Sequence, residues 1–208
     1  MIFLIDYRAG NLTSVQKALT ALEANFSIPN GPAELTEAKG IIVPGVGHFS
    51  ATKTLIGAWQ NAILERVAAG TPLLGICVGM QWLFEGSDEA PSIPGLGVMK
   101  GQCFRLVGQS DRRLKVPHVG WNVIQSVPAA PGRLLKGVMP DSQVYFTHSY
   151  ASPITSDCAA ITTHGQPFAS AVEREHIFGV QFHPEKSSQT GLRVLKNFLD
   201  VCQQKESD

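Results

Sequence analysis

The chain has 208 residues, 44% of them hydrophobic and 16% charged, and its 17 basic and 17 acidic side chains cancel. This composition excludes a disordered chain, and the length predicts one α/β domain over residues 1–208 with a sizeable core. The sequence has no basic block and no apolar run of membrane-spanning length, so we expect no nucleic-acid or membrane partner. The four cysteines are scattered and form no C-x-x-C pair, which predicts no metal site, no disulfide framework and a reducing, cytoplasmic setting.

Strands and helices are predicted to alternate in the first part of the chain. Short apolar runs indicate strands, and apolar residues spaced by three and four indicate helices. In chain order we expect a strand at 2–5, a break at Gly10–Asn11, a helix over 12–22, a weak strand at 26–28, a strand at 40–43, a helix over 50–69, a strand at 71–74 and a helix containing 82–85. This alternation predicts a parallel sheet with right-handed crossovers, where ligands bind at the carboxyl ends of the strands. Asp6–Tyr7, Pro44–Gly47 and Cys77 would meet at that edge.

The second half has short β-rich segments and little helical periodicity. Its expected strands lie at 97–106, 116–126, 143–147, 158–163 and 168–174, with exposed loops at 86–95 and 107–115. We therefore predict an antiparallel portion added to the parallel sheet. A last core strand at 176–182 leads into a helix capped by Ser187 or Ser188, and a frayed tail follows from Gln203.

The segment Gly75-Ile76-Cys77-Val78-Gly79 predicts a nucleophile elbow between a strand and a helix. In such a turn the nucleophile has strained backbone and its side chain is exposed above the sheet, while flanking glycines avoid a Cβ clash. The Cys77 thiol would lie at a helix N-terminus, which favours the thiolate. The alternative is an inert cysteine buried in the core after a strand.

His183-Pro184-Glu185 supplies a candidate base and its orienting group. In extended backbone, residues i and i+2 point to the same side, and the proline favours that conformation. Glu185 would then fix the tautomer of His183 and stabilise its imidazolium. By itself the tripeptide is more typical of a surface turn, and its position at a strand end, with a strand-borne cysteine elsewhere, favours the base instead.

Attack on a carbonyl also requires donors for the developing oxyanion. The N–H of Val78, directly after the nucleophile, is one candidate. A second donor would come from Val46 or Gly47 in the loop Pro44-Gly45-Val46-Gly47, where two glycines let the backbone approach a substrate. An ordinary strand-to-helix turn would carry the same residue types.

Taken together, these motifs resemble those of the class I (triad) glutamine amidotransferases, in order and in approximate spacing. Further segments resemble the glutaminase subunit of imidazole glycerol phosphate synthase. They are Asp6-Tyr7 with Gly10-Asn11-Leu12, Pro117-His118-Val119-Gly120-Trp121-Asn122, Phe146-Thr147-His148-Ser149-Tyr150 and His183-Pro184-Glu185-Lys186-Ser187. The resemblance spans nearly the whole chain and implies a flavodoxin-like fold, with a central mostly parallel sheet flanked by helices and an additional antiparallel β portion.

The resemblance also implies roles for individual residues. Cys77 would attack the side-chain amide of glutamine, release ammonia and leave a γ-glutamyl thioester that water hydrolyses. His183 would act as base and then acid, oriented by Glu185. The implied substrate-binding residues are Gly45, Gln81, His148, Ser149 and Tyr150.

The implied partner is a separate (β/α)8-barrel cyclase subunit, and no cofactor is expected. In the family, ammonia reacts there to give imidazole glycerol phosphate, for histidine biosynthesis, and an aminoimidazole carboxamide ribotide. Asn11, Trp121 and Lys186 resemble interface positions of the family. A tryptophan in a β-rich segment is, however, more often a core residue.

Two positions depart from the family pattern, and other functions stay open. Val78 replaces a common Leu without removing its backbone donor, and Arg8 occupies a loop position where a small residue is usual. The alternatives are a glutaminase that serves another synthase, a non-catalytic interaction module of the same fold, and a cysteine peptidase.

Overall fold

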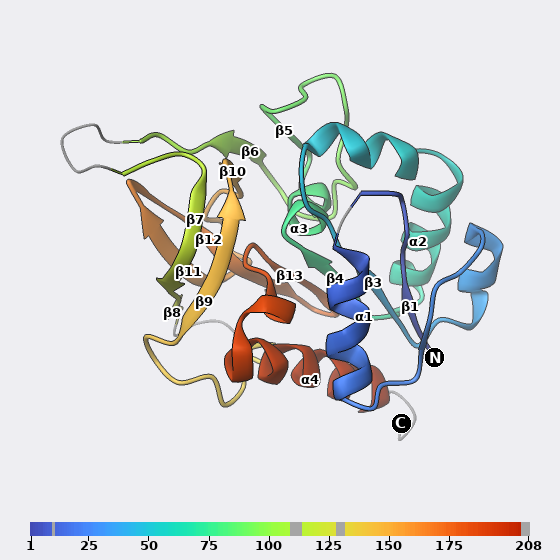
Figure 1. Ribbon diagram of the computed structural model, residues 1–208. Helices are drawn as coiled ribbons and strands as arrows, with labels where there is room; N and C mark the ends of the chain where they lie inside the picture. The colour runs from blue at the N-terminus through green and yellow to red at the C-terminus, as the bar shows by residue number, and fades with distance from the viewer. Residues whose placement is uncertain (10, 109–113, 128–131, 205–208) are drawn as a thin grey trace.

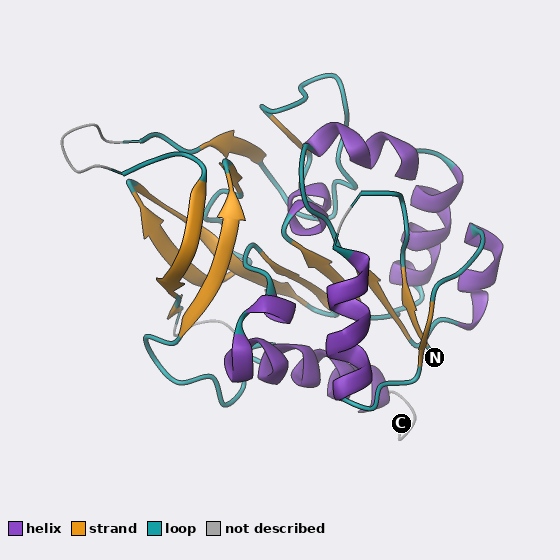
Figure 2. Cartoon of the chain, viewed as in Figure 1, coloured by secondary structure: helices purple, strands orange, loops and turns teal. Residues whose placement is uncertain are grey.

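An eight-stranded mixed sheet runs through the molecule, with helices packed on both sides (Figures 1 and 2). The computed structural model describes residues 1–9, 11–108, 114–127 and 132–204. The strands of this sheet, in spatial order, are β2 (Phe26–Ser27), β1 (Ile2–Leu4), β3 (Gly40–Val43), β4 (Leu73–Ile76), β13 (Ile177–Val180), β12 (Gln166–Arg174), β11 (Cys158–His164) and β8 (Gln125–Ser126). Neighbours from β2 to β13 pair in parallel, and those from β13 to β8 pair antiparallel.

The parallel strands form the centre of the core. Every residue of β1, β3, β4 and β13 is buried, which explains why these strands are continuous apolar runs without alternation. The strands predicted at 2–5, 40–43 and 176–182 are confirmed, whereas the one predicted at 71–74 lies two residues later, at Leu73–Ile76. The carboxyl ends of β3, β4 and β13 therefore lie next to one another, and they bring distant segments of the sequence to one place.

The helices cover the sheet as right-handed crossovers require. The helical elements are α1 (Leu12–Ala21), α2 (Ala58–Ala68), α3 (Val78–Leu83), α4 (Ser188–Gln204) and the 3-10 turns η1 (Pro32–Glu37), η2 (Phe49–Leu55) and η3 (Pro184–Lys186). The connections from β1 to β2 and from β3 to β4 run in opposite directions along the sheet, which places α1 and α2 on opposite faces. In Figure 1, α1 and α4 lie in front of the central strands.

The antiparallel portion predicted for the second half is confirmed, but much of it continues the central sheet. Strands β12, β11 and β8 extend that sheet beyond β13. Two smaller sheets complete the fold. They consist of β7 (His118–Val123) with β9 (Gln143–His148), and of β10 (Tyr150–Ala151) with β6 (Gln102–Arg105) and β5 (Gly86–Ser87).

Two predicted elements were wrong in detail. The helix expected over 50–69 is interrupted, because Ile56 is extended and Gly57 has φ +90°, a conformation that glycine adopts without strain. The loop expected at 86–95 begins with the buried strand β5, which pairs with β6. A two-residue strand carries no periodicity that a sequence pattern could reveal.

Several expectations fall partly outside the described residues. They concern the chain break at Gly10, the loop at 107–115, of which 109–113 is not described, and the tail, where Gln203 and Gln204 belong to α4 and 205–208 is not described. Helix α4 begins at Ser188 as expected, but the Ser187 hydroxyl does not cap it, since it donates to the His183 carbonyl. Over the part of the chain that the structure describes, no helix is long and apolar enough to cross a membrane.

Candidate active site

Cys77 lies at the junction of β4 and α3 in the strained geometry predicted for an elbow. Its φ of +53° and ψ of −109° place a non-glycine residue in sparsely populated backbone space. The Cys77 N–H donates to the Val180 carbonyl at 2.7 Å, which ties the turn to β13. The surrounding sheet therefore holds the thiol in place at a cost in backbone strain.

The two flanking glycines are required by packing. A Cβ at Gly79 would lie 1.9 Å from the Val43 carbonyl oxygen, and one at Gly75 would lie 2.5 Å from the Gly79 carbonyl oxygen. Helix α3 can thus approach β3 and β4 only because both positions lack a side chain. The glycine pattern of the elbow reports this close approach.

We predict that Gly79→Ala lowers the free energy of unfolding by about 2–3 kcal/mol, since the new methyl group must displace the backbone of β3 or α3. Urea denaturation followed by circular dichroism measures this. Gly31→Ala is the matched control, because a Cβ there meets nothing within 4 Å. Equal losses in the two variants would contradict the packing explanation.

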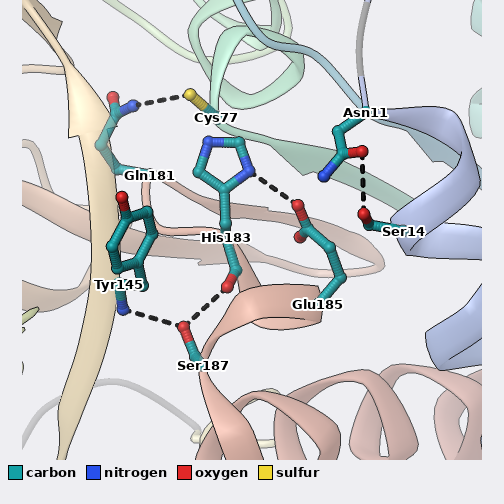
Figure 3. A network of polar contacts seen from close by, with 8 residues as sticks. All are labelled: Asn11, Ser14, Cys77, Tyr145, Gln181, His183, Glu185 and Ser187. Atoms are coloured by element: carbon teal, nitrogen blue, oxygen red, sulfur yellow. Dashed lines mark hydrogen bonds and ion pairs between the residues drawn. The ribbon is translucent and has the colours of Figure 1, made fainter. Parts of the chain in front are cut away.

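His183 and Glu185 form a buried pair beside the thiol. Nδ1 of His183 lies 2.8 Å from Oε1 of Glu185, and the two side chains are 2% and 1% exposed. In Figure 3 the imidazole ring lies between the Cys77 sulfur and the Glu185 carboxylate. Since Nδ1 is engaged by Glu185, and Nε2 makes no other hydrogen bond within the described residues, Nε2 is the nitrogen available to the thiol.

The backbone around His183 is fixed by a second set of bonds. The His183 N–H donates to the Tyr145 carbonyl at 2.9 Å, and the Ser187 hydroxyl donates to the His183 carbonyl at 2.6 Å. The same hydroxyl accepts the Tyr145 N–H at 2.9 Å (Figure 3). Ser187 therefore links the base to β9.

The charges of the site favour the imidazolium. Burial lowers the pKa of His183, but the neighbouring Cys77 sulfur and the Glu185 carboxylate outweigh it and raise the pKa to about 10. A proton that leaves the thiol is thus stabilised on His183 by partners on both sides. Together, the three side chains provide a thiol that can lose its proton, an imidazole that can accept it and a carboxylate that orients the imidazole. Nucleophilic catalysis by a thiol requires this arrangement.

A cavity of about 300 Å³ opens above Cys77. Predicted residues that line it are Val46, Gly47, Cys77, Val78, Gln81, His148, Ser149 and Tyr150, and further lining residues are His48, Glu89, Pro117 and Thr147. Val46, Gly47 and Val78 thus line the same cavity as Cys77, and their role as oxyanion donors stays a prediction. The cavity is large enough for an amino acid of glutamine's size.

Gly45 is placed differently from the other predicted substrate-binding residues. It is packed against Tyr7 and α3, and a Cβ there would lie 2.4 Å from the Tyr7 hydroxyl oxygen and 2.8 Å from the Gly79 nitrogen. Gly45 therefore lets the loop after β3 lie against the elbow, and its contact with substrate stays a prediction.

Two residues near Cys77, Glu89 and Gln181, were not predicted from the sequence. Glu89 accepts the Phe49 N–H at 2.7 Å and places a carboxylate at the cavity, within a segment expected to be exposed loop. Gln181 is fully buried and donates from Nε2 to the Cys77 sulfur at 3.6 Å. A single acid in a loop and a single amide near a strand end carry no pattern, although Gln181 has the i, i+2 relation to His183 that drew attention to Glu185.

His118 and His148 are hydrogen-bonded to each other behind the cavity. His118 Nδ1 lies 3.1 Å from His148 Nε2, and His148 Nδ1 lies 2.8 Å from the Tyr150 carbonyl oxygen. Burial and the neighbouring histidines lower the pKa of His118 to about 3, while burial lowers that of His148 to about 4. Both imidazoles are neutral near pH 7, which suits a structural role and not a proton-transfer role.

We predict that this histidine pair makes the fold sensitive to acid. The unfolded chain protonates both histidines near pH 6.5, whereas the folded chain does not, so stability falls as pH drops from about 6.5 towards 4. The free energy of unfolding should be lower at pH 5 than at pH 7 by on the order of 2 kcal/mol, after allowance for solvent screening. Urea denaturation at both pH values measures this, and His118→Asn should show a shallower dependence. An unchanged slope in the variant would contradict the assignment.

The three predicted interface residues lie on the surface or close to it. Trp121 is 51% exposed, so the alternative that it is a core residue was wrong. Its indole ring meets the ring of Tyr145 edge-on at 6.1 Å, and Lys186 Nζ lies 5.9 Å from the same ring. Asn11 precedes α1 and accepts the Ser14 hydroxyl at 2.8 Å. Their contact with a partner stays a prediction.

Arg8 occupies a backbone conformation that explains why a small residue is usual there. Its φ is +61°, and its N–H donates to Asp6 Oδ1 at 2.8 Å, which stabilises the turn after β1. This left-handed conformation is the one that glycine adopts most readily. The departure therefore changes strain in the first loop and leaves Cys77, His183 and Glu185 untouched.

Comparison with known proteins identifies the family to which this fold belongs. A model of the family "Glutamine amidotransferase class-I" matches residues 3–202, so the chain belongs to this family. A solved glutamine amidotransferase superposes with a TM-score of 0.74 at 18% identity, over 98% of this chain and 100% of that one. A putative GMP synthase subunit from Thermoplasma acidophilum gives 0.72 at 19% identity, over 99% and 94%. At these identities the structural likeness speaks for the fold alone.

Relatives of higher sequence identity show to which group within the family the chain belongs. The chain is 44% identical to the imidazole glycerol phosphate synthase subunit HisH of Moorella thermoacetica, over 96% of this chain and 94% of the relative. It is 41% identical to the HisH of Deinococcus radiodurans, over 95% and 92%. Within the amidotransferases the chain is thus a member of the HisH group. It also matches imidazole glycerol phosphate synthase hisHF of Emericella nidulans at 38% identity, over 97% of this chain and 38% of that protein.

Proposed function

We propose that the chain hydrolyses glutamine to glutamate and ammonia, and that it delivers the ammonia to a cyclase subunit in histidine biosynthesis. The observation that carries this proposal is the buried His183–Glu185 pair, joined at 2.8 Å beside a cysteine on a strained elbow. The class-I amidotransferase family and the HisH relatives support the identity of the substrate. The proposed location is the cytoplasm, which suits a chain with four scattered cysteines.

The first half of the reaction forms the thioester. The Cys77 sulfur attacks the carboxamide carbon of glutamine, while its proton moves to His183 Nε2. The negative charge on the former carbonyl oxygen is held by N–H donors from Val78 and from Val46 or Gly47, each worth roughly 3–4 kcal/mol of barrier. His183 then protonates the leaving nitrogen, the C–N bond breaks, and ammonia departs.

The second half regenerates the enzyme. Water loses a proton to His183 Nε2 and attacks the γ-glutamyl thioester carbon through the same oxyanion position. The C–S bond breaks, glutamate leaves, and the proton returns from His183 to the sulfur. Glu185 keeps its carboxylate on Nδ1 throughout, so Nε2 alone exchanges protons.

The cavity supplies groups suited to the two ends of an amino-acid substrate. Glu89 offers a carboxylate to the α-ammonium group, and the backbone around Ser149 and Tyr150 offers polar groups to the rest of the substrate. Gln81 lines the cavity from α3, with its Nε2 held by the Tyr150 carbonyl at 2.7 Å.

We predict that Glu89→Gln raises KM for glutamine by about tenfold and leaves kcat within a few-fold, because it removes a charge that binds ground state and transition state alike. The Gln side chain still has an acceptor for the Phe49 N–H. Steady-state ammonia release measures both constants. Asp88→Asn removes an exposed charge next to it and should change neither. A loss confined to kcat in Glu89→Gln would contradict this role.

The proposed partner is a separate (β/α)8-barrel cyclase. The name hisHF of the Emericella nidulans relative supports a HisF partner, and this chain covers 38% of that protein. The cluster of Trp121, Tyr145 and Lys186 includes Tyr145, whose carbonyl accepts the His183 N–H, so it is suited to carry partner contacts to the site. Ammonia would react in the barrel to give imidazole glycerol phosphate and the aminoimidazole carboxamide ribotide.

Titration of glutamine hydrolysis with the barrel cyclase tests the proposal. We expect little ammonia release by the chain alone and strong stimulation that saturates at equal amounts of the two proteins. Stimulation by another synthase and none by the cyclase would favour a different amidotransferase. No hydrolysis under either condition would favour a non-catalytic module.

A further inference from the structure

Gln181 is a buried amide between the nucleophile and a residue of the cavity. Its side chain is fully enclosed, and its Nε2 lies 3.6 Å from the Cys77 sulfur (Figure 3). Its Oε1 lies 3.1 Å from Gln81 Nε2. Its backbone N–H donates to the Ser170 carbonyl at 2.9 Å, which fixes the residue at the end of β13. Gln181 therefore has a defined position but no part in the reaction described above.

The Tyr150 carbonyl, which lies at the far end of the chain of hydrogen bonds from Cys77, determines which side of the Gln181 amide carries the NH2 group. The Tyr150 carbonyl oxygen can only accept, and it receives Gln81 Nε2 at 2.7 Å and His148 Nδ1 at 2.8 Å. Gln81 must therefore turn its NH2 group towards Tyr150, and the second hydrogen of that group reaches Gln181 Oε1. With its oxygen so engaged, Gln181 must turn its own NH2 group towards Cys77.

The chain of hydrogen bonds continues from Tyr150 away from the sulfur. His148 uses Nδ1–H for Tyr150, so its Nε2 accepts the Nδ1–H of His118, whose Nε2 accepts from Asn122 Nδ2 at 3.2 Å. Only neutral imidazoles satisfy this arrangement. The network thus begins on β7, next to Trp121, and ends with a donor aimed at the nucleophile.

We propose that Gln181 is a positioning residue for the nucleophile, whose N–H donor holds the Cys77 sulfur towards His183 and stabilises its thiolate. The inference rests on the proposed function in one respect, namely that the thiolate is the nucleophile that attacks glutamine. A donor favours the ionised sulfur over the thiol, and a hydrogen bond to a charged group has a larger effect when the pair is buried. The N-terminus of α3 and His183 then act on a Cys77 side chain whose orientation is already fixed.

Other titratable groups also face the sulfur and must stay constant in a test. His183 lies beside it from the segment after β13, Tyr7 faces it from the loop after β1, and His48, Glu89 and His148 line the same cavity. Substitution of Gln181 leaves all five in place. A changed titration of Cys77 can then be assigned to the lost donor.

The test is the pH dependence of alkylation of Cys77 by iodoacetamide, read at the Cys77 peptide by mass spectrometry. Gln181→Met keeps the approximate shape and removes the donor, while Gln181→Glu keeps an acceptor for Gln81. We expect the alkylation midpoint to rise by about one to two pH units in Gln181→Met, and at least as much in Gln181→Glu. The exposed Gln143→Met should leave the midpoint unchanged. An unchanged midpoint in a folded Gln181→Met protein overturns the proposal.

A measurement on the unaltered chain decides the matter if both variants unfold. In protein labelled with ¹⁵N, alkylation of Cys77 should shift the side-chain amide signals of Gln181 and leave those of Gln143 in place; stationary Gln181 signals overturn the proposal. Because alkylation requires no glutamine turnover, the outcome is separate from that of the proposed function. A shifted midpoint without hydrolysis refutes the glutaminase alone, and hydrolysis without a shift refutes the role of Gln181 alone.

Discussion

Replacement of Cys77 by serine should reduce cyclase-stimulated glutamine hydrolysis by about three orders of magnitude or more, while the protein stays folded. A hydroxyl is far less nucleophilic than a thiolate at neutral pH. If the serine did attack, it would form an oxygen ester, and both the formation and the hydrolysis of that ester would require proton transfer by His183. Ammonia release in the presence of saturating cyclase measures the loss. Circular dichroism should be unchanged, because the substitution exchanges one buried atom on an otherwise intact elbow.

The control for this result is a second buried cysteine. Cys158 lies on β11, and its thiol donates to the carbonyl of Ala160, two residues away, at 3.2 Å. Cys158→Ala should therefore keep full hydrolysis apart from any loss of stability. A glutamine-like diazo ketone should add to the Cys77 peptide of the unaltered protein and to no cysteine of Cys77→Ser. Persistent hydrolysis by Cys77→Ser would show that the nucleophile lies elsewhere.

Replacement of Glu185 by glutamine should lower kcat by about three to four orders of magnitude and change KM little. The carboxylate is buried and holds Nδ1 of His183 at 2.8 Å, so its loss removes both the charge that raises the pKa of His183 and the bond that fixes its tautomer. A neutral amide can place its NH2 group against Nδ1 and leave the proton on Nε2, the nitrogen that must accept from the thiol. Steady-state kinetics with saturating cyclase measures both constants.

The exposed Glu175→Gln is the matched control and should leave kcat unchanged. Because the lost charge lowers the pKa of His183, the imidazolium in Glu185→Gln should also dissociate at lower pH than in the unaltered chain. NMR of the His183 ring follows that titration. A Glu185→Gln enzyme with near-normal kcat would contradict the triad.

The elements that the sequence predicts correctly are those with a local pattern. Strands β3 and β4 are short apolar runs flanked by glycine and proline, and Leu192, Leu195 and Phe198 give α4 its helical period. The elbow is equally local, because Gly75 and Gly79 are required by the approach of α3 to β3 and β4. Backbone geometry that depends on residues adjacent in the sequence can be inferred from the types of those residues.

The features that the sequence does not reveal depend on contacts between distant segments. Glu89 reaches the cavity because its loop packs against η2, and Gln181 meets Gln81 across a separation of 100 residues. The exposure of Trp121 likewise depends on which face of β7 the small sheet with β9 leaves open. Residue type and spacing along the chain do not show which residues from distant segments come into contact.

The most direct test of the central claim uses glutamine labelled with ¹⁵N in its side-chain amide. The chain, the cyclase and the cyclase substrate are incubated with labelled glutamine and an excess of unlabelled ammonium, and the imidazole glycerol phosphate formed is analysed by mass spectrometry. We predict that the product carries the label, and that Cys77→Ser protein gives unlabelled product from the free ammonium. Unlabelled product with the unaltered chain, or labelled product with Cys77→Ser, would contradict the account.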